Sequence, residues 1–280
     1  MLGEDVPLCW DAWDIEKDSM DLLQAVSVPM EKNYVRKGHI GKVSTITQQI
    51  VLHQDEAIID FNTEIDWHED YHIRRAQFPV VLDSSHAIYD IPFGYVERST
   101  HSNTAIERAQ FESPAQKFVS ISDQKLTVAL MSDSKYGYSA KDGVLSISLL
   151  RSPKAPDPNA DMGMHHFQYS IVMTEKGIGD IIEKAERLNN PLLPLSIPEK
   201  ALVSVSSGFS FEMAKVSEDG SGIIFRVREY LGIGGEGEIS LSDTLDAATL
   251  VQTTMVEKTL KKESMHFRPF EVKTFYVKRC

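Results

Sequence analysis

The alternation of apolar and polar side chains is the feature that most constrains how this chain can fold. Between Ala57 and Trp67, the apolar residues Ile59, Phe61 and Ile65 share one parity with Trp67, and polar residues mostly occupy the other. A period of two residues predicts a β-strand that buries one face. Further strands of this kind are expected within residues 44–60, 75–83, 88–96, 110–114, 118–122 and 127–132. Strands of this length between turn residues predict a large antiparallel β-sandwich.

One stretch follows a helical period instead. Apolar residues recur at helical spacing from Ile178 to Leu188, and the sequence Asn-Asn-Pro at 189–191 ends that run. The proline-rich segment 191–198 then predicts a stiff linker. After it, residues 201–280 predict a second, smaller β unit. We therefore expect a mainly β chain, with a large sandwich domain at 1–194 and a small β-sandwich domain at 195–280.

The net charge argues against several classes of partner. The 280-residue chain carries 29 Lys and Arg against 41 Asp and Glu, a formal net charge of −12, which repels phosphate backbones and anionic lipid. No apolar run approaches the roughly 20 residues that span a bilayer, and the acidic N-terminus lacks the basic region of a signal peptide. Cys9 and Cys280 lie at opposite ends and form no disulfide framework. We therefore expect a cytoplasmic protein without nucleic-acid or membrane partners.

Hydrogen-bonding side chains cluster in the stretch Asp133–Pro158. It begins with Asp-Ser-Lys-Tyr-Gly-Tyr at 133–138. Asp142-Gly143 follows, a strong hairpin signal because glycine accepts the positive φ that primed turns need. An apolar strand is expected at 144–150, and the three prolines within 151–158 cannot continue a strand ladder. Such a loop is where a β scaffold presents side chains to a ligand, although a solvated surface hairpin would have the same sequence.

Residues 68–72, His-Glu-Asp-Tyr-His, match the zinc-peptidase motif H-E-x-x-H. The motif works on a helix, which places both histidines on one face. Here the flanking residues alternate as in a strand, and four strand residues span about 13 Å. Two nitrogens that each need to lie ~2.1 Å from one zinc ion cannot span that distance. We therefore do not expect a metal site at this motif.

Two other matches lack the context that their chemistry needs. Gly232–Gly237 fits G-x-G-x-x-G, but a dinucleotide site needs a helix directly afterwards. The next residues predict a strand, so we expect a hairpin tip. His165 and His166 are neighbours near Asp161, yet consecutive strand residues face opposite ways and cannot chelate one ion together. The residue types alone therefore indicate no catalyst.

Several longer motifs follow one another from the first residues to about Pro194. They are Trp10–Ile15, Glu64–Glu69 with Arg75–Val80, Tyr89–Gly94 with Glu97-Arg98, Phe111-Glu112, Asp133–Tyr138, Leu149–Pro153, Ala155–Pro158 with Asp161 and Gly163, and Ala185–Pro191. In this order they resemble the C-terminal β region of glycoside hydrolase family 38, the retaining, metal-dependent α-mannosidases, with the closest likeness to the cytosolic and bacterial branch. The resemblance implies a large antiparallel, galactose-mutarotase-like β-supersandwich followed by a small β-sandwich.

The resemblance also implies hydrolysis of terminal α-mannosides by residues that this chain lacks. Family members place the nucleophile, the acid/base and the zinc ligands in an N-terminal catalytic portion, and no segment here resembles those motifs. Retaining hydrolysis needs two carboxyl groups ~5–5.5 Å apart, and no such pair can be assigned. We expect no cofactor and no catalytic residue in this chain, with zinc or another divalent metal in the catalytic portion. Trp10 and Trp13 would then pack against that portion.

Substrate-binding residues are implied in one loop. In the lysosomal and Golgi branches, the loop equivalent to Asp133–Gly137 contains Asp-Arg and reaches toward the sugar site. Here Asp133 is retained and Lys135 would supply the positive charge, while Tyr136 would stack on a sugar face or donate a hydrogen bond. We therefore predict Asp133, Lys135, Tyr136 and Gly137 as substrate-binding residues, with Asp133 in a positioning role.

The expected partners are an α-mannoside oligosaccharide and the catalytic portion of the same enzyme. Two alternatives stay open: a β-sandwich that acts alone as a carbohydrate-binding or structural module, and a gene remnant without function. The sequence specifies neither the linkage preference nor the identity of the metal. It also does not specify the oligomeric state, and a homo-oligomer is one of the states it allows.

Overall fold

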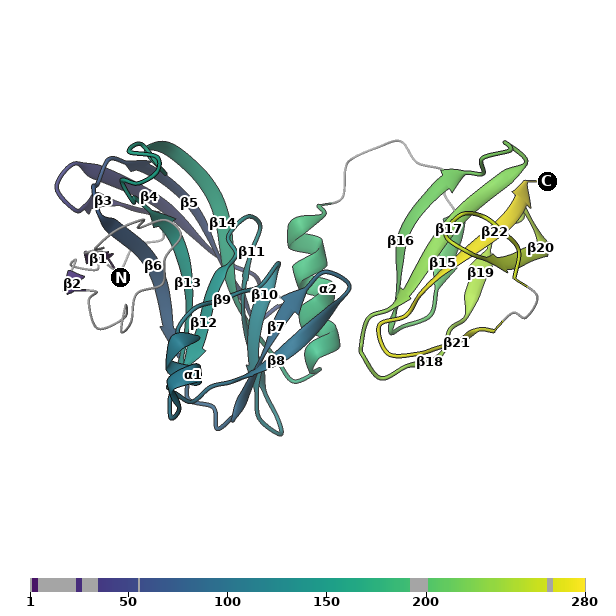
Figure 1. Ribbon diagram of the computed structural model, residues 1–280, viewed down its shortest axis with the longest axis horizontal. Coiled ribbons are helices and arrows are strands. Elements are labelled where there is room, and N and C mark those ends of the chain that lie inside the picture. The colour runs from purple at the N-terminus through teal and green to yellow at the C-terminus, as the bar shows by residue number, and fades with distance from the viewer. Residues whose placement is uncertain are drawn as a thin grey trace. The chain divides into compact units, whose positions relative to one another are not determined.

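The structure is a computed structural model that describes residues 2–4, 24–26, 35–54, 56–191, 201–260 and 264–279 (Figure 1). Two compact units make up the chain, each described separately below. They comprise Met1–Ile91 with Tyr95–Pro191, and Pro92–Gly94 with Leu192–Cys280. The expected domain boundary at 194/195, the linker after Pro191, both cysteines, Trp10 and Trp13 lie outside the described residues. Those predictions stay predictions.

An eight-stranded antiparallel sheet forms one layer of the first unit. In spatial order its strands are β3 (Val35–Ile40), β4 (Ser44–Leu52), β5 (Ile58–Trp67), β14 (Gly163–Thr174), β11 (Thr127–Ser132), β10 (Phe118–Ser122), β7 (His86–Ile91) and β8 (Gly94–Ser99). The longest pairing joins β5 to β14, with Trp67 opposite Gly163 and Ile58 opposite Val172. This pairing brings the middle of the chain beside its first third.

A six-stranded sheet forms the other layer. Its strands, in spatial order, are β2 (Gln24–Val26), β1 (Leu2–Glu4), β6 (His72–Pro79), β13 (Val144–Arg151), β12 (Gly137–Lys141) and β9 (Ser113–Pro114). β12 and β13 form the hairpin that Asp142-Gly143 predicts, and both turn residues have positive φ, 49° and 77°. Positive φ at both central positions defines a type I′ turn, whose twist matches that of the strands.

The core of the first unit lies between these two sheets. Ile65 and Trp67 on β5 and Phe167 on β14 belong to one apolar cluster with Tyr138 on β12 and Ile147 on β13. All five side chains are buried, and burying each one contributes roughly 1.5–3 kcal/mol. The side chains that share the parity of Ile65 and Trp67 in residues 57–67 therefore face the core, as the sequence pattern predicts.

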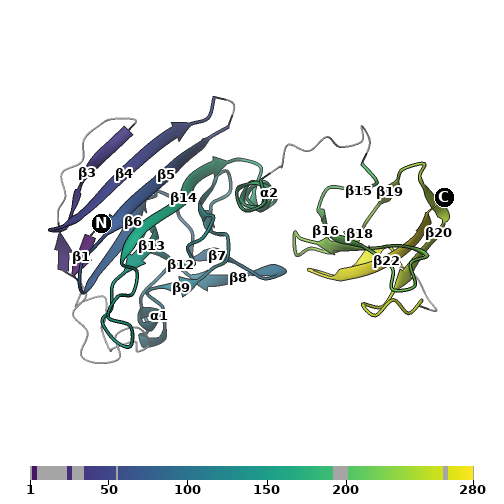
Figure 2. The same ribbon diagram turned by 90° about the horizontal axis from the view of Figure 1, so that it is seen from above.

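Two helices occur in the described part of the chain. α2 (Ile178–Asn189) follows the expected helical period, and it packs Ile181, Ile182 and Ala185 toward β11 and β14 (Figure 2). α1 (Ala105–Ala109) was not expected; it begins at a capping box formed by Thr104 and Glu107. The segment 88–96, expected as one strand, is instead the hairpin of β7 and β8, because Pro92 cannot continue a ladder.

The second unit is a smaller antiparallel β structure. Its main sheet has the order β16 (Phe209–Val216), β17 (Gly222–Glu229), β22 (Val272–Arg279) and β20 (Leu245–Thr253). Two strand pairs accompany it, β15 (Val203–Val205) with β19 (Ile239–Leu241), and β18 (Gly235–Glu236) with β21 (His266–Phe267). Phe225, Phe267 and Phe275 are buried in its core. The mainly β fold predicted from the sequence is thus confirmed.

Candidate functional site

The loop Asp133–Tyr136 connects β11 of one sheet to β12 of the other. Both of its ends are tied to the same short segment ahead of β10. The backbone N–H of Ser132 donates to the carbonyl of Lys117 at 3.0 Å, and the N–H of Ala115 donates to the carbonyl of Tyr136 at 2.9 Å. A loop closed in this way loses little further entropy when it binds a ligand.

Asp90 on β7 holds that supporting segment in place. Its backbone carbonyl accepts a hydrogen bond from the N–H of Gln116 at 2.9 Å, and its carboxylate accepts one from the N–H of Lys117 at 3.0 Å. The neighbouring Tyr89 is buried, and its hydroxyl accepts from the N–H of Ala140 on β12. The motif Tyr89-Asp90 therefore joins β7, the supporting segment and β12 around the loop.

Asp133 binds the loop to β14 through its side chain. One carboxylate oxygen accepts from the N–H of Gln168 at 3.0 Å, and the other accepts from the hydroxyl of Ser134 at 2.7 Å. The N–H of Asp133 itself donates to the carbonyl of Gln168 at 3.2 Å. Because both carboxylate oxygens accept hydrogen bonds from the protein, this geometry suits a positioning residue.

The C-terminal end of α2 supports the same loop. The side-chain amide of Asn189 donates to the carbonyl of Ser132 at 3.2 Å. The hydroxyl of Ser132 accepts from the N–H groups of Ser134 and Lys135 at 3.3 and 3.2 Å. The helix end thus fixes the residue from which the loop turns.

Lys135 is half-buried, and its ammonium group lies over an aromatic ring. The ammonium lies 4.6 Å from the centroid of the buried Phe167 ring, within cation–π range. Burial lowers the pKa of Lys135, while the carboxylates of Asp161 and Asp133 act in the opposite direction. Among the described residues, no acceptor forms a hydrogen bond with the ammonium. A half-buried cation that keeps its donors is suited to bind oxygen atoms of a polar ligand.

Tyr136 and Gly137 differ in what they can offer a ligand. Tyr136 is 58% exposed, so its ring and hydroxyl face solvent. Gly137 has no space for a side chain, because a Cβ atom there would lie 2.4 Å from a carboxylate oxygen of Glu112. The four predicted residues therefore have different parts. Tyr136 is exposed and Lys135 is half-buried with its ammonium over Phe167, whereas Asp133 ties the loop to β14 and Gly137 makes room for Glu112.

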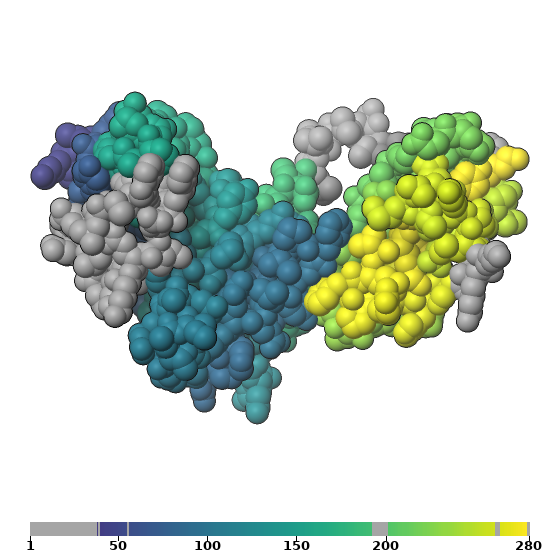
Figure 3. Space-filling model, in the orientation of Figure 1, coloured from purple at the N-terminus to yellow at the C-terminus, as the bar shows by residue number. Residues whose placement is uncertain are grey.

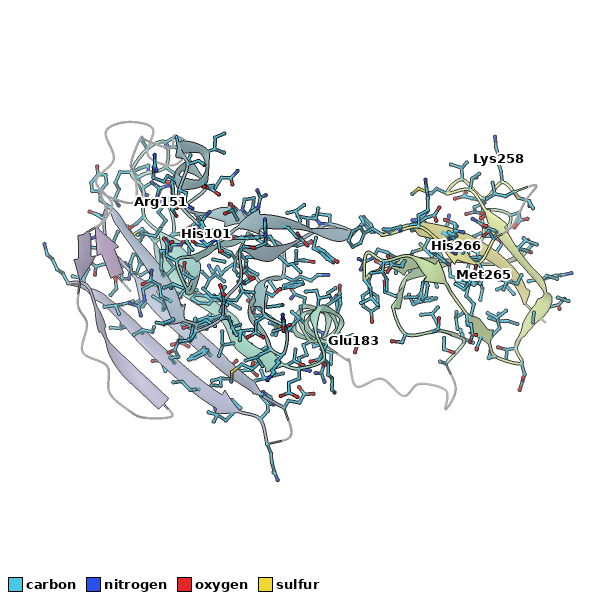
Figure 4. The ribbon with its side chains drawn as sticks, turned by 90° about the horizontal axis from the view of Figure 1, so that it is seen from below. His101, Arg151, Glu183, Lys258, Met265 and His266 are labelled. Carbon is cyan, nitrogen blue, oxygen red and sulfur yellow. The ribbon has the colours of Figure 1, made fainter. Side chains whose placement is uncertain are left out.

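The loop after β13 completes this end of the sandwich. It follows Arg151, labelled in Figure 4, and forms the projection at the upper left of Figures 1 and 3. Within it, a carboxylate oxygen of Asp161 accepts from the N–H of Arg151 at 2.8 Å, and the Asp161 carbonyl contacts His165 Nε2 at 2.8 Å. Asp161 is thereby held where its charge acts on Lys135.

The H-E-x-x-H match is not a metal site. Residues 68–71 connect β5 to β6, and the second histidine, His72, is the first residue of β6. Glu69 is 3% exposed, and one of its oxygens accepts from the N–H groups of Lys42, Val43 and Ser44. Within the described ranges, no group of three or more His, Cys, Asp and Glu residues could hold a metal ion.

The other two motif matches also have structural roles. The segment Gly232–Gly237 is a loop that contains the two-residue strand β18. The next element is the strand β19 and not a helix, as expected. His166 Nδ1 lies 3.4 Å from the carboxylate of Glu64, while the neighbouring His165 contacts Asp161. The two histidines therefore bind different partners. Neither helix in the described part of the chain is long and apolar enough to cross a membrane.

Comparison with known proteins decides the family. Residues 3–159 match the family model described as glycosyl hydrolases family 38 C-terminal domain, and residues 208–275 match that of the family 38 C-terminal beta sandwich domain. The chain belongs to glycoside hydrolase family 38. It corresponds to the C-terminal portion of the family's α-mannosidases, as the motifs predict.

Relatives of this family-38 chain are longer proteins. The chain is 37% identical to human "Alpha-mannosidase 2C1" over 223 residues, which cover 75% of this chain and 21% of that protein. It is 30% identical to "Alpha-mannosidase G" of Dictyostelium discoideum over 310 residues, which cover 98% of this chain and 28% of that protein. This family-38 chain thus spans between about a fifth and three tenths of the length of these relatives.

A solved structure shares the fold. The crystal structure of an alpha-mannosidase from Enterococcus faecalis V583 superposes with a TM-score of 0.70 at 19% identity, covering 83% of this chain and 29% of that one. At this identity the likeness concerns the fold alone. It agrees with the two β units described above.

Proposed function

We propose that this chain is the C-terminal portion of an α-mannosidase that hydrolyses terminal α-mannosides of oligosaccharides, and that it forms one wall of the sugar site. The supporting observation is the loop Asp133–Tyr136, which is held at both ends and contains an exposed Tyr136 and a half-buried Lys135 whose ammonium lies over Phe167. The names of the family-38 relatives supply the reaction class.

The chemistry of bond cleavage belongs to the N-terminal catalytic portion in this proposal. There, two carboxyl groups carry out retaining hydrolysis, and a zinc or other divalent ion binds sugar hydroxyls. In this proposal, the residues of this chain take no part in that step. Their contribution is to bind and orient the sugar, which lowers the entropic part of the barrier.

Within the site, Lys135 donates hydrogen bonds to oxygen atoms of the mannoside. Its ammonium lies over the ring of Phe167, and the charges of Asp161 and Asp133 act on it. Tyr136 covers one face of the sugar ring or donates through its hydroxyl. The two cysteines, which form no disulfide framework, support a cytoplasmic location for the enzyme.

Three preparations test this proposal in parallel: this chain alone, the catalytic portion alone, and both together, each assayed for hydrolysis of an aryl α-mannoside with zinc or cobalt added. We expect hydrolysis to need both portions. Hydrolysis by this chain alone would show that its own residues catalyse the reaction. Sugar binding by this chain, without any effect on the catalytic portion, would favour a stand-alone binding module. Neither binding nor any effect would favour a gene remnant.

A further inference from the structure

The carboxylate of Glu112 occupies the space where Gly137 would carry a side chain. A Cβ atom on Gly137 would lie 2.4 Å from one oxygen of Glu112 and 3.0 Å from its carboxyl carbon. Gly137 is the first residue of β12, directly after the candidate sugar loop. It pairs with Ser148 on one side and Pro114 on the other. Its φ lies outside the left-handed region, so the glycine provides space here and not an unusual backbone conformation.

Glu112 is held in that space from two sides. Arg75 on β6 lies 3.3 Å from one carboxylate oxygen, and the hydroxyl of Ser148 on β13 donates to the same oxygen. Arg75 is buried and also donates to the hydroxyl of Ser146 at 2.9 Å. Moving the carboxylate would weaken the pairing of a buried guanidinium, which is costly in an environment of low polarity. Glu112 therefore cannot swing aside freely.

The three residues connect four strands at the base of the loop. Arg75 comes from β6, Glu112 precedes β9, and Gly137 opens β12 beside β13. Two residues beyond Glu112, Pro114 pairs with Gly137, and Ala115 then donates to the carbonyl of Tyr136. A shift of the Glu112 carboxylate would thus reach Tyr136 through both its backbone partner and its neighbour in sequence.

We propose that Glu112, Arg75 and Gly137 are positioning residues for the sugar loop, and that Gly137 acts by leaving room for Glu112 without touching the sugar itself. This inference rests on the proposed role of the loop in the α-mannoside site. It assigns a positioning task to the Arg75–Glu112 pair, and it changes the expected part of Gly137 from a contact to a spacer.

The test compares single and double variants in the enzyme assembled from this chain and its catalytic portion. We expect Gly137→Ala to raise KM for an aryl α-mannoside about tenfold or more, because displacements of about 1 Å in a site can cost up to a hundredfold. In the double variant Gly137→Ala/Glu112→Asp, the acidic side chain is one methylene shorter. Its carboxylate then leaves room for the new Cβ atom and still provides a partner for Arg75. The double variant should recover most of the lost affinity, although each single change weakens it.

Gly38→Ala is the matched control, because a Cβ on Gly38 meets nothing within 4 Å and its φ is ordinary. It should leave KM unchanged. Hydrogen exchange of the amides in 132–138 provides a readout that does not depend on sugar binding: exchange should rise in Gly137→Ala and fall again in the double variant. If exchange and KM do not recover in the double variant, the spacer role is wrong. If exchange follows the expectation while KM does not change, the proposed sugar site is wrong instead.

Discussion

Replacing Glu229 with alanine is expected to destabilise the second unit by about 3–5 kcal/mol. This carboxylate is 1% exposed at the end of β17. Its two oxygens accept from the backbone N–H groups of Leu231, Gly232 and Phe270 at 2.8–3.0 Å, and from that of Ile233 at 3.4 Å. Removing the acceptor deprives these donors of a charged partner in a space that water enters poorly.

Hydrogen exchange of β17 and β22 amides measures this loss within the second unit. Glu229→Gln should also destabilise the unit, because its amide places a donor against backbone donors. Glu238→Ala serves as the control, since that side chain is exposed in the same unit, and it should change stability by no more than about 0.5 kcal/mol. Equal exchange in Glu229→Ala and Glu238→Ala would contradict the role given to Glu229.

Glu69→Ala is expected to cost the first unit about 3 kcal/mol. One oxygen of this buried carboxylate accepts from the three consecutive N–H groups of the turn between β3 and β4, at 2.9–3.1 Å. Gly41 in that turn has a φ of 71°, and a Cβ there would lie 2.3 Å from the Glu69 carboxyl carbon. The turn is therefore built around this carboxylate. Urea unfolding followed by tryptophan fluorescence measures the loss, with the exposed Glu97→Ala as control.

The contribution of Glu69 should also depend on pH. Burial acts to raise its pKa, but the hydrogen bonds from Val43, Ser44 and Lys42 outweigh burial and leave the pKa below its usual value. A carboxyl group with a lowered folded-state pKa stabilises the protein fully above its unfolded-state pKa of about 4.3. That stability is lost as the pH falls through the lower, folded-state value. The stability difference between the natural chain and Glu69→Gln should therefore shrink below about pH 4. A difference independent of pH would contradict this account.

Local patterns in the sequence were sufficient to predict much of the fold. The alternation from 57 to 67 identified the face of β5 that is buried, because side-chain direction in a strand depends only on parity. Asp142-Gly143 predicted a turn whose two positive φ values glycine and aspartate tolerate. The helix 178–189 was recognisable because its apolar spacing and its Asn-Asn-Pro end agree.

Other elements depend on contacts that no local pattern contains. The segment 88–96 was expected as one strand, although Pro92 divides it into two paired strands. α1 was missed, although Thr104 and Glu107 form a recognisable capping box, because it has only five residues and no buried side chain. Only two residues of the expected strand 110–114 form β9, and Glu112, directly before them, pairs with the distant Arg75.

The candidate loop was predictable, but its supports were not. The hydrogen-bonding residues of 133–137 are consecutive, so the sequence displays them together. The loop is held by Asp90, Glu112 and Asn189 through residues 115–117, Gly137 and Ser132, and each of the three lies at least 21 residues from the loop in the sequence. They lie within the family-38 motifs, yet only the strand order shows that those motifs surround one loop.

The central claim is that Lys135 binds the sugar from this loop, and kcat/KM of the Lys135→Ala enzyme tests it most directly. Loss of a charge-assisted hydrogen bond should reduce kcat/KM for an aryl α-mannoside about ten- to a hundredfold. Lys135→Arg should retain most of the activity, and the exposed Lys125→Ala, at the opposite end of β11, should retain all of it. If Lys135→Ala matches the natural enzyme in kcat and KM, the loop does not line the sugar site.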